Sequence, residues 1–297
     1  MGEITALLET ANTYHEEGDL APALENFQQA YDLAQEADDK LNSAKALNGL
    51  GGVHFDLGLG KEALEFFNQS LELGKEIGDK SVQATAMNSL GLFHAQNGRN
   101  QDALEFYAQA IPLFQELDDK ENEGWALSNA GMAHSNLGEK ETALEFYEKS
   151  LVVYQSTDDR QAVGGMLNNI GKTYSAMGER EKAIDYMTQA LAIREETDDL
   201  DGKATTLNNI GGVYADMGDK RKALDYFLQT VPMLEELDDK VALITTLTNV
   251  AASFEGIGEK RKAVPFKQRA KKLGKIMKQE AKKAKKMQRE LLKSMGE

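Results

Sequence analysis

The sequence contains no cysteine. This absence excludes disulfide bonds, thiolate nucleophiles and cysteine-ligated zinc, and it leaves nothing that requires an oxidising compartment. Apolar residues also never run together for the roughly 18 positions that a membrane-spanning helix needs. No basic stretch followed by an apolar segment opens the chain, as a secretion signal would. We therefore expect a cytoplasmic protein without a membrane span.

Proline and aromatic residues are scarce. The 297 residues include 4 prolines, and aromatic residues make up 7% of the total. The strands of a sandwich or barrel would need more β-branched and aromatic residues than this composition offers. The composition predicts an all-α fold.

The negative charge is unevenly distributed along the chain. Residues 1–259 hold 46 acidic and 19 basic residues, whereas residues 260–297 hold 3 acidic and 15 basic residues. The formal net charge of -15 therefore combines an acidic body with a basic tail. Such an asymmetry indicates a separate interaction role for the tail.

The chain repeats itself every 40 residues. The glycines that share one position of the repeat are Gly18, Gly58, Gly98, Gly138, Gly178, Gly218 and Gly258. The alanines that share a second position are Ala23, Ala63, Ala103, Ala143, Ala183, Ala223 and Ala263. Between these positions the apolar residues fall at helical spacing. A fixed period of this length is typical of a solenoid.

Each unit is predicted to form two antiparallel helices. In the second unit, the first helix spans roughly 41–57 and the second roughly 60–77. The first helix ends at a glycine, which readily adopts the left-handed conformation that closes a helix. Aspartates recur just before the next helix and are predicted to cap its free N–H groups. These are Asp39, Asp79, Asp119, Asp159 and Asp239.

The repeat carries a family resemblance. One unit reads Leu47-Asn48-Gly49-Leu50-Gly51, then His54, Gly58, Ala63-Leu64, Phe67 and Ser70-Leu71. This pattern resembles the tetratricopeptide repeat (TPR), in the 40-residue variant of kinesin light chains, spindle-orientation adaptors and many bacterial multi-repeat proteins. The resemblance covers about seven units and implies a right-handed superhelical solenoid that binds proteins or peptides. We expect the solenoid over residues 1–258, and the last second helix with a basic amphipathic extension over 259–297.

The residues give little support to catalysis. Three of the four histidines, His54, His94 and His134, share a repeat position with tyrosine and phenylalanine, which indicates a role in shape. The stretch from Asp198 to Gly202 lacks the alternating ligands and terminal glutamate of a calcium loop, so its aspartates are interpreted as caps. The glycines are not clustered as in a phosphate-binding loop. We expect no enzyme activity, no metal and no cofactor.

The concave face of the first helices is the predicted binding surface. Asparagine fills one position on that face in four consecutive units, and its amide can both donate to and accept from the main chain of an extended peptide. Three further residues lie on the same face, one turn away. The predicted peptide-binding residues are Asn129, Asn169, Asn209, Asn249, Trp125, Met132 and Lys172. Alternatively, the asparagines hydrogen-bond to one another and fix the stacking, and Trp125 packs on a neighbouring helix.

The basic tail leaves several partners open. Its apolar residues recur at spacings of three, four or seven positions, as on an amphipathic helix. The helix would fold onto its own acidic body, bind nucleic acid or an anionic membrane, or pair with another helix. Nucleic acid is disfavoured, because the body is acidic and the tail lacks interleaved aromatic residues. The predicted function is a scaffold or adaptor; the alternatives are self-assembly through this helix and a regulatory module of a separate effector.

Overall fold

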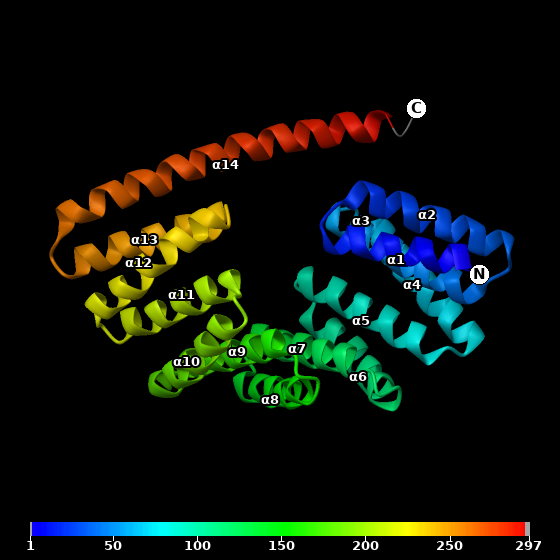
Figure 1. Ribbon diagram of the computed structural model, residues 1–297, viewed down its shortest axis with the longest axis horizontal. Helices are drawn as coiled ribbons and strands as arrows, with labels where there is room; N and C mark the ends of the chain where they lie inside the picture. The colour runs from blue at the N-terminus through cyan, green and yellow to red at the C-terminus, as the bar shows by residue number, and fades with distance from the viewer. Residues whose placement is uncertain (1, 295–297) are drawn as a thin grey trace. The chain divides into compact units, whose positions relative to one another are not determined.

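The computed structural model describes the backbone of residues 2–294 and the side chains of residues 2–283. Within that range the chain forms fourteen α-helices and no strand, which confirms the all-α prediction (Figure 1). No helix of the described part is long and apolar enough to span a bilayer. The chain divides into two compact units, unit 1 (residues 1–159) and unit 2 (residues 160–297).

Unit 1 contains four helix pairs. Its helices are α1 (Gly2–Glu16), α2 (Leu20–Glu36), α3 (Lys40–Asp56), α4 (Gly60–Ile77), α5 (Lys80–Gln96), α6 (Asn100–Glu116), α7 (Lys120–Asn136) and α8 (Lys140–Ser156). Each odd-numbered helix packs on the even-numbered helix that follows it, and the successive odd-numbered helices α1, α3, α5 and α7 also touch one another. This is the packing of a solenoid.

Unit 2 contains three helix pairs in the same arrangement. Its helices are α9 (Arg160–Met177), α10 (Arg180–Glu196), α11 (Leu200–Asp216), α12 (Lys220–Glu236), α13 (Lys240–Gly256) and α14 (Lys260–Ser294). The seven pairs in all agree with the predicted repeat number. The seventh second helix and the basic extension are one continuous helix, α14.

Two kinds of residue end the helices. Every first helix ends near a glycine with positive φ, for example Gly58 at 75°. The second helices end instead at an aspartate with positive φ in five repeats, such as Asp38 at 52°, and at Gly78 in the second repeat. The aspartate that follows caps the next helix, as predicted: Asp39 accepts from the backbone N–H of Asn42 at 3.1 Å. These helix-terminating and capping residues recur every 40 residues and so set the lengths of the helices.

Small residues allow the two helices of a pair to approach closely. A Cβ atom placed on Gly51 would lie 2.5 Å from the ring of Phe67, and one on Gly171 would lie 3.0 Å from the carbonyl oxygen of Ala183. The facing alanines, such as Ala63 and Ala183, are fully buried. The core of each unit therefore consists of aromatic and branched side chains packed against glycines and alanines.

Candidate functional site

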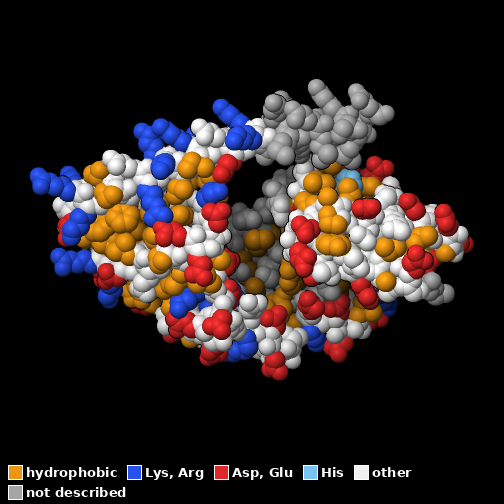
Figure 2. Space-filling view, turned by 45° about the horizontal axis from the view of Figure 1, so that its top comes forward, with side chains coloured by type: hydrophobic (Ala, Val, Ile, Leu, Met, Phe, Trp, Pro, Cys, Tyr) orange, Lys and Arg blue, Asp and Glu red, His pale blue; other side chains and the backbone are white. Residues whose placement is uncertain are grey.

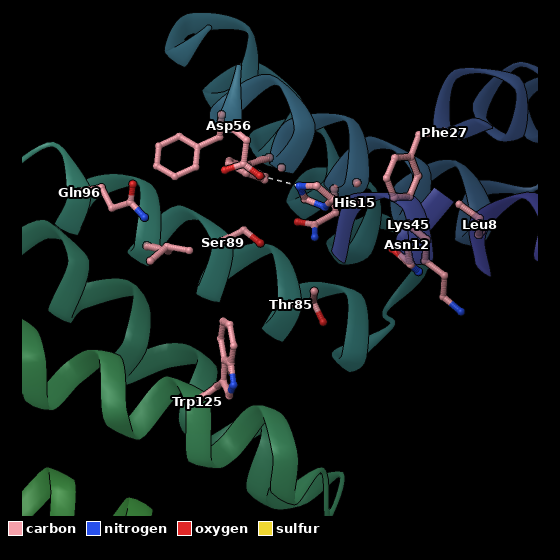
Figure 3. Close-up of a pocket in the computed structure, with 16 residues that line it drawn as sticks. Leu8, Asn12, His15, Phe27, Lys45, Asp56, Thr85, Ser89, Gln96 and Trp125 are labelled. Carbon is pink, nitrogen blue, oxygen red and sulfur yellow. Dashed lines mark hydrogen bonds and ion pairs between the residues drawn. The ribbon is translucent and has the colours of Figure 1, made fainter. Parts of the chain in front are cut away.

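A pocket of about 510 Å³ opens among the first helices of unit 1 (Figure 3). Residues of α1, α3 and α5 supply most of its lining. Phe27 of α2, Phe67 of α4 and Trp125 of α7 complete it. The pocket thus lies on the helix layer that the sequence predicts to bind a partner.

Two glycines of α3 let side chains of the pocket lining pack directly on this helix. A Cβ atom on Gly49 would lie 2.2 Å from the ring of Phe27, and one on Gly52 would lie 2.9 Å from the imidazole of His15. In four later repeats, the position of Gly49 carries asparagine. Glycine at these two positions therefore makes room for the Phe27 ring and the His15 imidazole, which a larger residue would displace.

The lining of the pocket is largely apolar, and Trp125 is its most exposed large residue. The Trp125 side chain is 56% exposed and rises from α7 toward Thr85 and Ser89 of α5 (Figure 3). Leu8 and Phe27 line the pocket although they are buried in the core. An aromatic ring exposed beside apolar walls is typical of an interface anchor.

The charged groups of the pocket differ in their pairing. His15 Nε2 lies 2.7 Å from Asp56 Oδ2, so this pair holds both side chains in place. Lys45 also lines the pocket, and its ammonium group is exposed and forms no ion pair within the described residues. The pocket therefore offers one unneutralised cation beside apolar walls.

The structure places the other predicted site residues of unit 1 on the same helix as Trp125. Met132 is 41% exposed. Asn129 is half-buried, and its Nδ2 atom is buried without a hydrogen-bond partner in the described part of the chain. Of the seven predicted residues, Trp125 lines the pocket.

The predicted residues of unit 2 occupy successive first helices. Asn169, Asn209 and Asn249 are half-buried, and Lys172 is exposed. Asn209 Nδ2 donates to Asn168 Oδ1 on the preceding first helix at 3.1 Å. One amide of the predicted column is therefore already engaged in stacking, which is the alternative role that the sequence left open.

A second column of asparagines joins neighbouring first helices. Thr246 Oγ1 of α13 donates to Asn208 Oδ1 of α11 at 3.1 Å. In unit 1 the equivalent Asn48 lines the pocket, and its Oδ1 atom is buried without a partner among the described residues. In unit 2 these amides hydrogen-bond successive first helices to each other. In unit 1 the Oδ1 atom of Asn48 stays available as an acceptor at the pocket.

The histidines predicted to serve packing contact aromatic rings, and two of them, His94 and His134, stack on their partners. In six repeats the side chain at this position contacts the aromatic residue twelve positions later, on the second helix of the same pair. The pairs are His54–Phe66, His94–Phe106, His134–Phe146, Tyr174–Tyr186, Tyr214–Tyr226 and Phe254–Phe266, with ring centroids 4.9 to 5.6 Å apart. Burial lowers the pKa of His94, and Arg99 lowers it further while Asp102 opposes the shift.

The aspartates near residue 199 act as caps. Asp199 accepts from the backbone N–H of Gly202 at 2.8 Å, and its carboxylate pairs with Arg194. Among the described residues, no group of three or more histidine, aspartate or glutamate side chains converges in a way that could hold a metal ion.

Sequence reasoning missed the pocket itself. It concentrated on the four units that carry asparagine, whereas the pocket lies chiefly in the preceding units, where that position holds Gly49 and Ser89. The signal was present, because two positions of the repeat lose their side chains together at Gly49 and Gly52.

The family model described as tetratricopeptide repeat matches residues 2–76, 82–156 and 163–236. A search of curated proteins by sequence gave no match.

Solved structures with a similar fold have low sequence identity. BtubC (BKLC) from P. vanneervenii is 21% identical with a TM-score of 0.66, over 74% of this chain and 92% of that one. A Rap protein complexed with Competence and Sporulation Factor is 15% identical with a TM-score of 0.66, over 93% and 76%. A STAND protein with a tetratricopeptide repeat sensor from Pyrococcus horikoshii is 16% identical with a TM-score of 0.74, over 92% and 44%.

Proposed function

Because this chain belongs to the tetratricopeptide repeat family, we propose that it is a scaffold or adaptor whose first helices bind an extended segment of a partner protein. The binding segment is extended because the odd-numbered helices of a unit follow one another along one face. This function needs neither catalysis nor a cofactor, since shape and hydrogen bonding suffice for recognition.

The pocket of unit 1 is the observation that carries this proposal. It combines apolar walls, the exposed ring of Trp125 and the unpaired ammonium of Lys45. An apolar side chain of the partner fits between the walls, and a neighbouring carboxylate of the partner would neutralise Lys45. The Rap protein complexed with Competence and Sporulation Factor shares this fold and holds a partner of its own.

The asparagine column and its neighbours complete the proposed site. Asn129, Asn169, Asn209 and Asn249 would grip the partner's main chain, and Met132 and Lys172 would add specificity. Asn209 already donates through Nδ2 and so contributes its Oδ1 atom as an acceptor. Asn129 in unit 1 and the three asparagines in unit 2 offer such groups on half-buried side chains.

Selection from a library of displayed peptides against the full chain supplies a ligand with which to test the pocket. Trp125→Thr places at residue 125 the amino acid found at the same repeat position in Thr85, Thr205 and Thr245. We expect this variant to bind the selected peptides at least about tenfold more weakly, as loss of an aromatic anchor does. The matched control is Val241→Thr, which alters a side chain that is 63% exposed and lies in α13. Equal affinities for the wild type and the Trp125 variant would reject the pocket.

A separate set of variants tests the asparagine column. Replacement of Asn169 and Asn209 together by alanine should weaken binding while the helical content, measured by circular dichroism, stays unchanged. Asn168→Ala is the matched control, because it removes the hydrogen bond to Asn209 and leaves the column intact. Unchanged affinity in the double variant would reject the column, and equal losses in both variants would show that these asparagines act through stacking.

A further inference from the structure

The exposed face of α14 carries a row of lysines without partners. Lys271, Lys275, Lys278 and Lys282, here called the lysine stripe, are all exposed. Their spacings of four, three and four positions place them on one face of the helix. At a rise of about 1.5 Å per residue, the stripe is about 16 Å long. It therefore forms a continuous cationic ridge.

The apolar face of α14 packs on unit 2. Phe266, Ala270 and Leu273 pack in a cluster with Leu243 and Leu247 of α13. This packing fixes the rotation of α14 on unit 2, so the lysine stripe faces away from the apolar core. The stripe is therefore a surface feature of a well-anchored helix.

Three cations of α14 outside the stripe, Lys262, Lys267 and Arg269, pair with acidic side chains. Lys267 Nζ lies 2.7 Å from Glu255, and the guanidinium of Arg269 pairs with Glu235. The four lysines of the stripe form no ion pair within the described residues. Their positive charges repel one another at this spacing, and an anionic surface laid along the ridge would relieve that repulsion.

The complementary charge lies in unit 1. Residues 1–159 hold 29 acidic and 9 basic residues, whereas residues 160–297 hold 20 acidic and 25 basic residues. Figure 2 shows acidic side chains over unit 1 and basic ones gathered along α14. Glu25, Glu65, Glu105 and Glu145 recur at one exposed repeat position on successive second helices of unit 1 and form no ion pair within the described residues. The chain thus carries both halves of a charge-matched contact.

Other polyanions fit the stripe less well. A membrane would need apolar side chains on the same face, but between Lys271 and Lys282 that face holds none among the described residues. A nucleic acid would gain from aromatic stacking, and Phe266, the aromatic residue of α14, packs in the core instead. The net charge of -15 also repels both.

We propose that the lysine stripe docks on the acidic surface of unit 1 of a second copy of this chain. The contact joins two different surfaces, so a docked pair still presents one free stripe and one free acidic unit. Association is driven by charge and is therefore strongest at low ionic strength, where screening is weak. This assembly leaves the pocket of unit 1 out of the contact and does not rest on peptide binding.

Light scattering of the full chain over a range of concentrations tests the proposal. At about 20 mM NaCl we expect a mass above that of the monomer that rises with concentration, and at about 500 mM a return to the monomer, because the Debye length falls severalfold. A monomer at every concentration in both salts would overturn the proposal. So would a monomer that merely expands in high salt, since the stripe would then dock within its own chain.

Charge reversals identify the surfaces. Lys275→Glu with Lys278→Glu should weaken association at least about tenfold at low salt. The matched control, Arg180→Glu with Arg221→Glu, makes the same change in net charge at the half-buried Arg180 of α10 and the exposed Arg221 of α12, which lie outside unit 1 and form no ion pair in the described chain. If both variants associate equally weakly, the change in net charge alone explains the loss, and the lysine stripe is not the contact surface.

Charge reversal on the acidic surface allows a test in which two association-deficient variants restore association when mixed. Glu65→Lys with Glu105→Lys should also weaken self-association, because it reverses part of the acidic surface. Mixed in equal amounts with the Lys275 and Lys278 variant at low salt, it should restore a mass above the monomer, since its unaltered stripe meets the unaltered acidic unit of the other variant and the two reversed surfaces also match. Failure of the mixture to associate would contradict the proposed pairing. Binding of anionic vesicles or duplex DNA by a chain that stays monomeric, lost in the stripe variant, would assign the stripe to that partner instead.

Discussion

At the scale of single residues, glycine has two unrelated uses in this chain. Gly131 lies where α7 crosses α8, and a Cβ atom there would be 2.9 Å from the ring of Tyr147 and 3.3 Å from the Ala143 carbonyl oxygen. Gly212 of α11 has open space where its Cβ would lie. The first glycine is required for packing, and the second is a helix residue of low propensity.

Leucine at these two positions should therefore act in opposite directions. Gly131→Leu should lower the free energy of unfolding by about 1–3 kcal/mol, because the side chain overfills a closed contact. Gly212→Leu should raise it by roughly 0.5–1 kcal/mol through helix propensity. Thermal and denaturant unfolding followed by circular dichroism measure both. An unchanged midpoint for Gly131→Leu would mean that this helix crossing tolerates bulk.

His94 should make stability depend on pH. Its pKa in the folded chain lies below the ordinary value of 6.5, chiefly because burial disfavours the charged imidazole. Below pH 6.5 the unfolded chain therefore binds the proton more tightly than the folded chain, and stability falls as the pH drops. His94→Phe keeps an aromatic ring in contact with Phe106 but cannot be protonated, so it should lose this part of the pH dependence of stability. Melting curves between about pH 7.5 and pH 5 should show a smaller drop for the variant; equal drops would contradict the assignment.

At the scale of helices, the sequence defines the boundaries well. The second repeat was expected at roughly 41–57 and 60–77, and its helices span Lys40–Asp56 and Gly60–Ile77. The agreement arises because the helix ends are set locally, by the positive φ of a glycine or aspartate and by the side-chain cap of the aspartate that follows, without help from distant residues. The hydrogen bond between Asn168 and Asn209 was only one of two open alternatives, since it depends on the rotamers of two neighbouring helices.

The aromatic pairs are one of the tertiary contacts that link the two helices of a repeat, in six of the repeats. Tyr214 of α11 and Tyr226 of α12 have ring centroids 5.5 Å apart at an interplanar angle of 11°. Lys222 Nζ lies 4.9 Å from the centroid of the Tyr214 ring. The stack and the cation together cover the end of the helix pair.

A double-mutant cycle should detect this stack. Tyr214→Ala and Tyr226→Ala should each destabilise unit 2, and the double variant should lose less than the sum, by about 0.5–1.5 kcal/mol. The control cycle pairs Tyr214→Ala with Val241→Ala, because Val241 is exposed and packs with neither tyrosine. Chemical denaturation provides the energies. Additivity in the tyrosine cycle would show that the rings merely lie near each other.

At the scale of the whole molecule, the chain divides into two compact units after Asp159. The repeat pattern continues through this point without a shift in phase, so periodicity alone gave no sign of a boundary. The pocket of unit 1 was unforeseen for a related reason. Periodicity reports what the repeats share, and a site arises where one repeat departs from the others, as at Gly49 and Gly52.

Shortening α14 tests how far the core extends. A chain that ends at Lys275 keeps Phe266, Ala270 and Leu273 in their cluster and loses the 3.3 Å ion pair of Lys240 with Glu280. Its melting temperature should fall by no more than about 3 °C. A chain that ends at Glu259 exposes Leu243 and Leu247 and should lose much of the helicity of unit 2. A much lower melting temperature for the chain that ends at Lys275 would mean that residues 276–297 contribute to the core.

Within each unit, every junction between repeats brings the same positions together at intervals of 40 residues. A duplication or deletion of one whole repeat would therefore leave matching surfaces on either side of the change. A change of any other length would set core positions against loop residues. Only insertions or deletions of whole repeats therefore preserve the packing. The number of first helices available to contact a partner changes by one with each such event.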